Sequence, residues 1–341
     1  MTVLARSVLA LAAVASCASL LPTRRLTAQT QPTGDNYRIS GPYAHENLSV
    51  FLIHGPNRSS RKLLTLEEAL DEQKVVVYET RNVNELSIEN VSSEDVFIES
   101  GDIVKGGAQD RTLKDDLILP SKSGKVTISS FCVEHGRWTR RGNESVATFN
   151  GSQQAVATKQ LKMAVRMKAD QSEVWNQVAQ AQEKLSARVG SGARAAASPS
   201  SFVMSMEAPA VRRSTDGYIQ ELAGIVNGKS DVVGYAFAID GKINSADIYA
   251  SHDLFGKLWM KLLRASSVEA VTEFQPGKKF EAVPITAVKT ALHDADSGKA
   301  SAKDLTDRTR VVVKETEKNV VFETRDRAAR EGWVHKSYLS K

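Results

Sequence analysis

The feature that most constrains the fold is a hairpin signal in the second half of the chain. Asp240 and Gly241 separate two strand-like runs, 232–239 and 243–249, and such a dipeptide favours the tight turn that joins antiparallel strands. The first run is apolar at nearly every position, so both of its faces need cover. We therefore expect residues 232–239 to form a central strand of an enclosed sheet.

The remaining sequence divides into a β-rich half, residues 37–150, and a half of mixed helices and strands, residues 151–341. Alternating or β-branched runs predict strands at 37–39, 48–54, 75–80, 86–91, 96–104 and 125–134. Apolar residues at helical spacing predict helices at 66–73, 153–168, 172–188, 215–226, 254–271 and 284–295. Later strands are expected at 310–313, 320–324 and 333–339.

Strands and helices do not alternate regularly, which argues against a Rossmann-type dinucleotide-binding domain. We predict an α+β fold, with a β-rich N-terminal half followed by helices packed on a second, smaller set of strands. The segment 190–201 is rich in Gly, Ala and Ser, and its composition predicts a mobile loop. The sequence leaves open whether the two halves are separate domains.

A stretch with more charge than a turn needs, residues 99–112, lies between the apolar runs 96–98 and 117–119, which look like paired strands. Its polar residues include Asp102, Lys105, Gln109, Asp110 and Arg111. Gly106 and Gly107 let backbone N–H groups approach a ligand closely, and lysine and arginine suit an anion. A long hairpin with solvated charges and a glycine bulge explains the same residues. The stretch is not a P-loop, because no Gly-Lys-Ser/Thr opens a helix.

A second group of candidate residues lies at the end of the predicted strand 125–134. Glu134 ends a largely apolar strand face, so a buried Glu134 needs a raised pKa or a cation partner, for which Arg137 is near. The alternative turns Glu134 to solvent. Trp138 follows, either as a packing residue or as a stacking platform.

Three acids, Asp102, Asp110 and Glu134, offer oxygens that can hold Mg²⁺, bind ribose hydroxyls or pair with nearby cations. The candidate ligand-binding residues are Asp102, Lys105, Gly106, Gly107, Gln109, Asp110, Arg111, Glu134, Arg137 and Trp138. No catalytic residue, metal ligand or cofactor is assigned from the sequence.

Three motifs, 100–111, 131–138 and 233–249, occur in this order and resemble a bacterial family. It is the ADP-ribosylglycohydrolase- and rhodanese-phosphatase-associated protein family, and the resemblance covers roughly residues 37–280. The resemblance implies a link to ADP-ribose or nucleotide metabolism. His135 departs from the family pattern, in which Gln is expected, so the resemblance gives His135 no catalytic role.

Charge and cysteine content exclude several functions. Three of the 45 basic residues and none of the 40 acidic ones lie in residues 1–28, so the remainder carries only +2 and indicates no nucleic-acid partner. Beyond residue 28 the sole cysteine is Cys132, so no disulfide can form within that part. We expect Cys132 to be a small buried strand residue, and without a Cys-x-x-Cys pair it indicates no zinc site.

Residues 1–28 have the composition of an export signal. Arg6 supplies the positive start, and the segment 7–21 is mostly apolar but short for a membrane span. Cleavage at the small-residue site ending at Ala28 would remove the segment, while residues 14–17 also resemble a lipobox, in which Cys17 carries a lipid anchor. We expect an exported protein with a cleaved signal, a polar linker at 29–36 and no later membrane span.

Two functions fit these observations. The first is binding, extending to hydrolysis, of a small phosphorylated or nucleotide-like ligand, with Lys105, Arg111 and the backbone of residues 106–107 around the anion. The second is a non-enzymatic interaction module of the cell envelope, in which the charged motif only rigidifies the β-rich half.

Overall fold

The computed structural model describes residues 37–329 and 332–341. The expected signal peptide with Cys17 and the linker 29–36 lie outside the described residues. The described chain belongs to one unit, Asp35–Lys341, and its fold is α+β, as the sequence predicts. No described helix combines the length and the apolar character needed to cross a membrane.

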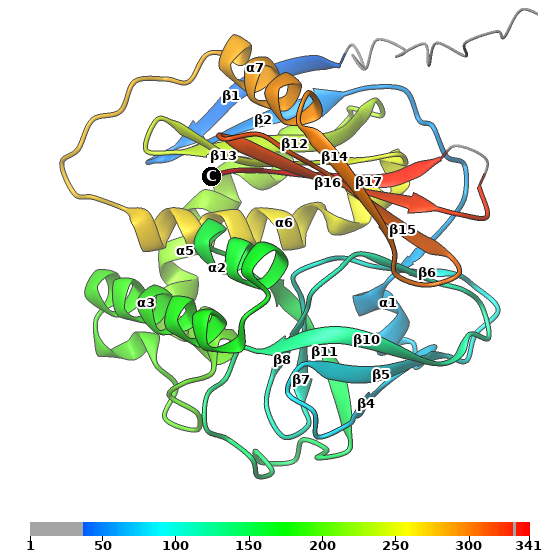
Figure 1. Cartoon of the computed structure of the whole chain (residues 1–341). Coiled ribbons are helices and arrows are strands. Elements are labelled where there is room, and N and C mark those ends of the chain that lie inside the picture. The colour runs from blue at the N-terminus through cyan, green and yellow to red at the C-terminus, as the bar shows by residue number, and fades with distance from the viewer. Residues whose placement is uncertain (1–36, 330–331) are drawn as a thin grey trace, which may run out of the picture. The chain divides into compact units, whose positions relative to one another are not determined.

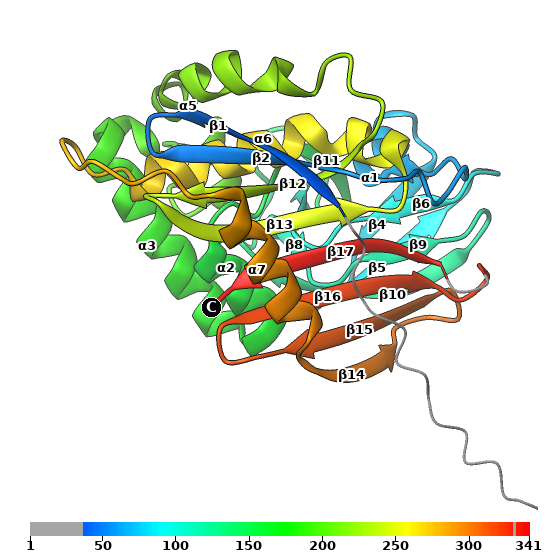
Figure 2. The ribbon, with the colours of Figure 1, turned by 90° about the horizontal axis from the view of Figure 1, so that it is seen from above.

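A large antiparallel sheet forms the upper layer in Figure 1, and its strands are seen from above in Figure 2. Their order is β1 (Arg38–His45), β2 (Leu48–His54), β12 (Val232–Ile239), β13 (Lys242–Tyr249), β17 (Trp333–Ser340), β16 (Asn319–Asp326), β15 (Thr309–Glu315) and β14 (Lys299–Asp304). Strand β12 is buried at all eight positions, which confirms that it is central. The turn that follows has positive φ at both Asp240 and Gly241, as a two-residue hairpin requires.

A closed barrel is formed by the strands that follow β2 in the first half of the chain. Its order is β10 (Gly124–Cys132), β5 (Glu85–Asn90), β4 (Val75–Glu79), β11 (Thr148–Ala155), β7 (Asp102–Gly106) and β8 (Arg111–Leu113). A small sheet consists of β3 (Leu64–Thr65), β6 (Val96–Ile98) and β9 (Leu117–Leu119). The pairing of β6 with β9 confirms that the runs flanking the charged motif are paired strands.

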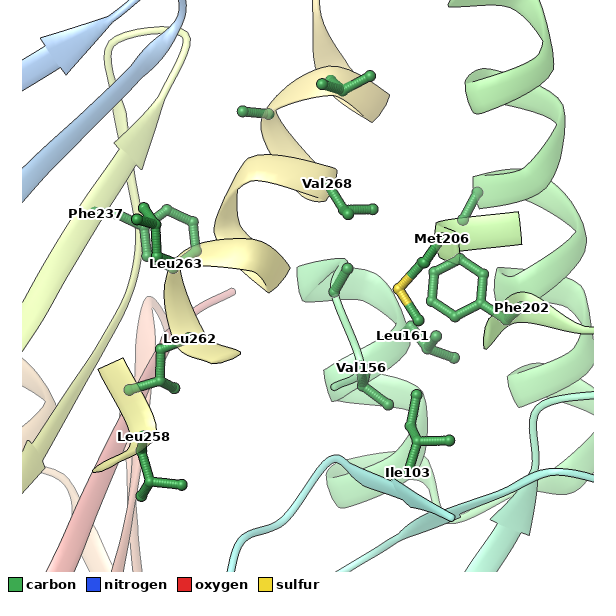
Figure 3. Close-up of a cluster of buried hydrophobic side chains, with 14 of the residues drawn as sticks. Ile103, Val156, Leu161, Phe202, Met206, Phe237, Leu258, Leu262, Leu263 and Val268 are labelled. Carbon is green, nitrogen blue, oxygen red and sulfur yellow. The ribbon is translucent and has the colours of Figure 1, made fainter. Parts of the chain in front are cut away.

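Helices cover both faces of the large sheet. Helix α7 (Ile285–Asp296) packs on one face, and α6 (His252–Glu273) lies on the other, between the sheet and the barrel (Figure 1). Figure 3 shows Leu263 of α6 beside Phe237 of the sheet, with Leu161 on the other side of the helix, all in one apolar cluster. The other helices are α1 (Leu66–Asp71), α2 (Lys159–Met163), α3 (Gln171–Val189), α4 (Phe202–Glu207) and α5 (Pro209–Leu222).

Three differences from the sequence-based expectation have a local physical reason. Gly101, with a φ of 93°, divides the predicted strand 96–104 into β6 and β7, which enter different sheets. The helix predicted from residue 153 begins later, because β11 continues to Ala155 and the Thr158 hydroxyl caps α2. Strand β14 was not predicted, since all of its residues are exposed and it has no apolar face.

Candidate functional site

Two groups of charged side chains, most of them fully buried, lie near the ends of the motif 99–112. We call the first the Arg141 cluster; it consists of Asp110, Glu134, Arg137 and Arg141. We call the second the His335 centre; it consists of Glu99, Asp116, Asp247 and His335.

The glycines of the motif set the backbone conformation, and their amides are already occupied. Gly106 and Gly107 have φ values of 119° and 53°, and a Cβ on Gly107 would collide with the ring of Phe149. The Gly106 N–H donates to Asp110 Oδ1 at 3.1 Å, and the Gly107 N–H donates to the Ser145 carbonyl at 2.9 Å. These donors are therefore committed to protein acceptors instead of pointing toward a vacant anion site.

Arg141 joins the two carboxylates of its cluster. Its two terminal nitrogens donate to the two carboxylate oxygens of Asp110 at 2.7 and 2.9 Å, the strong bidentate geometry. It also donates to Glu134 at 3.1 Å. Arg137 Nε lies 2.8 Å from Glu134 Oε1, which confirms the cation partner expected for a buried Glu134. The cluster balances its own charge and acts as a structural lock.

The segment 190–201 ends in two buried serines that complete this lock. The Ser201 hydroxyl donates to Asp110 Oδ2 at 2.7 Å, and the Ser198 hydroxyl donates to Glu134 Oε1. The composition of the segment did not indicate these contacts, because serine is equally common in flexible linkers. The mobility of the segment as a whole stays a prediction.

The charges on β7 point to opposite sides, as the alternation of a strand predicts. Asp102 Oδ1 lies 2.8 Å from Lys261 Nζ of α6, whereas Lys105 Nζ lies 2.6 Å from Glu207 Oε2 of α4. Among the described residues, the three acids proposed to share Mg²⁺ do not converge. Asp102 pairs with Lys261 of α6, and the other two acids belong to the Arg141 cluster.

The remaining candidates are Gln109, Arg111 and Trp138. Arg111 is fully buried and donates to the Gln109 carbonyl at 3.0 Å, with Glu79 Oε2 at 3.5 Å. The buried side-chain amide of Gln109 has no hydrogen-bond partner within the described chain. Trp138 is 54% exposed, so it is not a core packing residue. Ligand binding by these motif residues stays a prediction.

His335 of β17 lies among three carboxylates. Its Nδ1 is 2.8 Å from Asp116 Oδ2, and its Nε2 is 3.3 Å from Asp247 Oδ1 and 3.8 Å from Glu99 Oε1. Tyr249 of β13 is the cross-strand partner of His335, and the two rings stack 4.4 Å apart. Because side chains alternate along a strand, Asp247 shares the face of Tyr249 and reaches His335 diagonally.

Burial and ion pairing move the pKa values of this centre in opposite directions. Burial raises the pKa of Glu99 to about 8. Burial alone would lower the pKa of His335, but the attraction of Asp116 and Asp247 outweighs it and raises this pKa to about 10. For Asp116 the cost of burial is outweighed by His335, which holds the pKa of that carboxyl well below its usual range. Divergent pKa values within one buried cluster are typical of functional sites.

A cavity of about 30 Å³ lies beside the His335 centre, with room for one or two water molecules. Its charged and phenolic lining residues are Glu99, Lys162, Arg166, Tyr235, Asp247 and His335. Arg166 belongs to a π-helical turn, Ala164–Lys168, that continues α2, and such turns are frequent at functional sites. Its guanidinium lies 3.8 Å from the ring centroid of Phe322, and its buried Nε has no hydrogen-bond partner among the described residues.

Sequence reasoning missed five of the eight residues in these two groups. The residues not singled out are Glu99, Asp116, Arg141, Asp247 and His335. One available signal was a charged residue between two apolar ones, as Asp247 is between Ala246 and Ile248 in the second strand of the predicted hairpin. A buried strand tolerates such a residue only where a hydrogen-bond or ion-pair partner is present.

Residues 36–339 match the model of a protein family described as the ARG and Rhodanese-Phosphatase-superfamily-associated Protein domain, ARPP-1. No curated protein and no solved structure matches the chain. The family match spans nearly all of the 341 residues and confirms the resemblance carried by the three motifs. The chain therefore belongs to the ARPP-1 family.

Proposed function

We propose that this protein binds a small phosphorylated or nucleotide-like ligand at the cavity beside the His335 centre, which has room only for an anionic group of the ligand. The observation that carries the proposal is the pair of cations at this cavity. Among the described residues, neither Lys162 nor Arg166 has a carboxylate within ion-pair distance, although both line the cavity. Half-buried cations without a direct ion-pair partner attract an anion, and a guanidinium suits phosphate in particular.

The rest of the lining suits a polar ligand. Ser337 brings a hydroxyl group to the cavity, and Asp247 brings a carboxylate that can accept a hydrogen bond. Hydrolysis belongs to the proposal because acid and base groups border the same space.

The proposed ligand position differs from the one expected from the sequence. It lies at the first residues of the motif 99–112 and not at its centre. The amides at Gly106 and Gly107 are occupied, and Lys105 is paired with Glu207. Glu99, the first residue of the motif, reaches the cavity instead. Its own N–H donates to Asp102 at 2.9 Å, so the motif positions the new site.

A second candidate function is the non-enzymatic envelope module. It is favoured by the Arg141 cluster, in which every charged group has an internal partner. Export also favours it, because ADP-ribose and similar nucleotides are mainly cytoplasmic ligands.

We further propose that the protein is exported and that residues 1–28 are removed. The support is the sequence pattern of Arg6 followed by the apolar segment 7–21. Intact-mass analysis of the envelope fraction would distinguish a chain starting near Gln29 from one that is lipidated at Cys17. A cytoplasmic chain that begins at Met1 would refute export.

The ligand proposal is tested by thermal shift and calorimetric titration with inorganic phosphate, ADP-ribose and nucleotides. We expect Arg166→Gln and Lys162→Met each to weaken binding about tenfold to a hundredfold, the value of one lost charge-assisted hydrogen bond. The melting temperature should change little, because neither cation has an ion-pair partner.

Arg188→Gln is the matched control, because Arg188 also lies over a phenylalanine ring, that of Phe274 at 4.1 Å, but does not line the cavity. Its binding should equal that of the wild type. An empty ligand screen, or equal losses in the Arg166 and Arg188 variants, would favour the envelope module.

A further inference from the structure

Three side chains of the His335 centre are arranged like the ligands of a metal ion. In the described part of the chain, one atom each from Glu99, Asp247 and His335 lies within 4.8 Å of the other two. The three residues are only 5%, 6% and 1% exposed, and all of them line the cavity. Carboxylate oxygens with an imidazole nitrogen form a donor set that suits Zn²⁺ or Mn²⁺.

The spacing of these atoms is that of a coordination shell. Two ligands about 2.1 Å from Zn²⁺ at a tetrahedral angle lie roughly 3.4 Å apart. His335 Nε2 lies 3.3 Å from Asp247 Oδ1 and 3.8 Å from Glu99 Oε1. Both separations exceed the usual N–H···O range of about 2.7–3.2 Å, and Nε2 makes no hydrogen bond to any described residue.

The second nitrogen of His335 is held as it is in metal sites. Asp116 Oδ2 lies 2.8 Å from Nδ1, so Nδ1 keeps its proton, and a metal ion would take the place of the proton on Nε2, which borders the cavity. Asp116 is itself fixed, since it accepts from Thr324 Oγ1 at 2.7 Å and from the Ser100 N–H at 2.8 Å. A carboxylate behind a ligating histidine fixes the ring and raises its basicity.

Charge balance points the same way. Glu99, Asp116 and Asp247 surround His335, while the nearby buried cation Lys261 already pairs with Asp102. A divalent ion would replace the Nε2 proton of His335 as the positive charge between Glu99 and Asp247, in a place from which bulk water is largely excluded.

We propose that Glu99, Asp247 and His335 bind one divalent transition-metal ion, with its open coordination position facing the cavity. This metal site deepens the proposed function. It rests on the proposed function only for the identity of the group that fills the open coordination position. When bound, the ion would act as a Lewis acid toward a phosphoryl oxygen. Asp116 is a positioning residue, because it acts through His335.

The test uses the full chain, stripped with a chelator and then incubated with Zn²⁺, Mn²⁺ or Mg²⁺ alone. Elemental analysis after gel filtration should find about one Zn²⁺ or Mn²⁺ per chain and little Mg²⁺. Co²⁺ should give the visible absorption of a low-symmetry site. Asp247→Asn and Glu99→Gln should abolish stoichiometric binding, whereas Asp116→Asn should weaken it about tenfold to a hundredfold.

Glu269→Gln is the matched control, because Glu269 is a carboxylate buried to the same degree, 1% exposed, on α6. It should keep the metal. The proposal is overturned if the wild type retains no stoichiometric Zn²⁺ or Mn²⁺, or if the Asp247 and Glu99 variants bind as the wild type does. Should those variants not fold, the wild-type stoichiometry and Co²⁺ spectrum decide alone.

The same samples separate this inference from the ligand proposal. Stoichiometric metal with no response to phosphate or nucleotides would refute the ligand proposal and leave the metal site standing. Binding of nucleotide by the stripped wild type, lost in Arg166→Gln, together with failure to take up any metal, would refute the metal site alone.

Discussion

The ammonium of Lys261 lies 2.8 Å from Asp102 Oδ1, and this single contact ties α6 to strand β7 of the barrel. Both residues are buried, at 5% and 2% exposed. Burial alone would lower the pKa of Lys261, but attraction to Asp102 outweighs it and holds this pKa above the ordinary value of 10.5. Asp102 also accepts from the Glu99 N–H, so the ion pair supports the His335 centre.

Breaking this pair from one side should be costly. Lys261→Met leaves the Asp102 carboxylate buried without a cation, and we expect a loss of about 3–5 kcal/mol in the free energy of unfolding. Adding Asp102→Leu should recover much of the loss. Lys257→Met is the control, because its pair with Glu68 is partly exposed and is worth about 0.2–1 kcal/mol. Urea unfolding decides, and equal losses in the two single variants would contradict the expectation.

The Arg141 cluster allows a comparison between two arginines that are adjacent in the sequence. Arg141→Met removes the cation shared by Asp110 and Glu134, and we expect a loss of about 3–5 kcal/mol. Arg140→Met changes an exposed side chain and should stay within about 0.5 kcal/mol of the wild type. Thermal or urea unfolding of both variants is the measurement. A small loss in the Arg141 variant would show that the cluster is not a structural lock.

Gly234 of β12 controls the position of Asp247. A Cβ at Gly234 would collide with the Asp247 carbonyl oxygen on β13, so Gly234→Ala should destabilise by about 1–3 kcal/mol and weaken metal uptake. Gly256, exposed on α6 with open space around it, is the matched site. Gly256→Ala should stabilise by about 0.5–1 kcal/mol, because alanine favours the helix. We therefore expect a loss of stability together with a loss of bound metal only in Gly234→Ala.

Cys132 should be unreactive in the folded protein. It is a fully buried free thiol, and burial raises its pKa from 9.0 to about 11, so less thiolate forms at pH 8 by a factor of about a hundred. In a Cys17→Ser background, iodoacetamide should label Cys132 slowly in buffer and rapidly in urea. The native rate should rise about tenfold per pH unit until the pH approaches 11. Fast labelling at pH 8 without denaturant would refute a closed environment.

Features of the fold that depend on neighbouring residues were predictable. The turn at Asp240 and Gly241 follows from the dihedral angles that these residue types adopt, and the cap at Thr65 follows from Glu68 three residues later. Strand β14 could not be predicted, because the lysines and small residues of an exposed edge carry no periodic pattern.

Only part of the candidate site could be predicted from the sequence, for the same reason. Glu134 and Arg137 are close in the sequence, so their pairing was foreseeable. Asp247 and His335 meet only because β13 lies against β17, and that neighbourhood is fixed by the packing of the whole sheet. No local pattern reports which distant strand a buried polar residue will face.

The order of strands in the large sheet also sets an order of events during synthesis. The barrel strands all come from residues 75–155 and can pair as soon as the ribosome has released them. Strand β2 must wait for β12, and the His335 centre must wait for β17, so a nascent chain carries a finished barrel beside an open strand edge. Of these parts, the His335 centre is therefore the last to be completed.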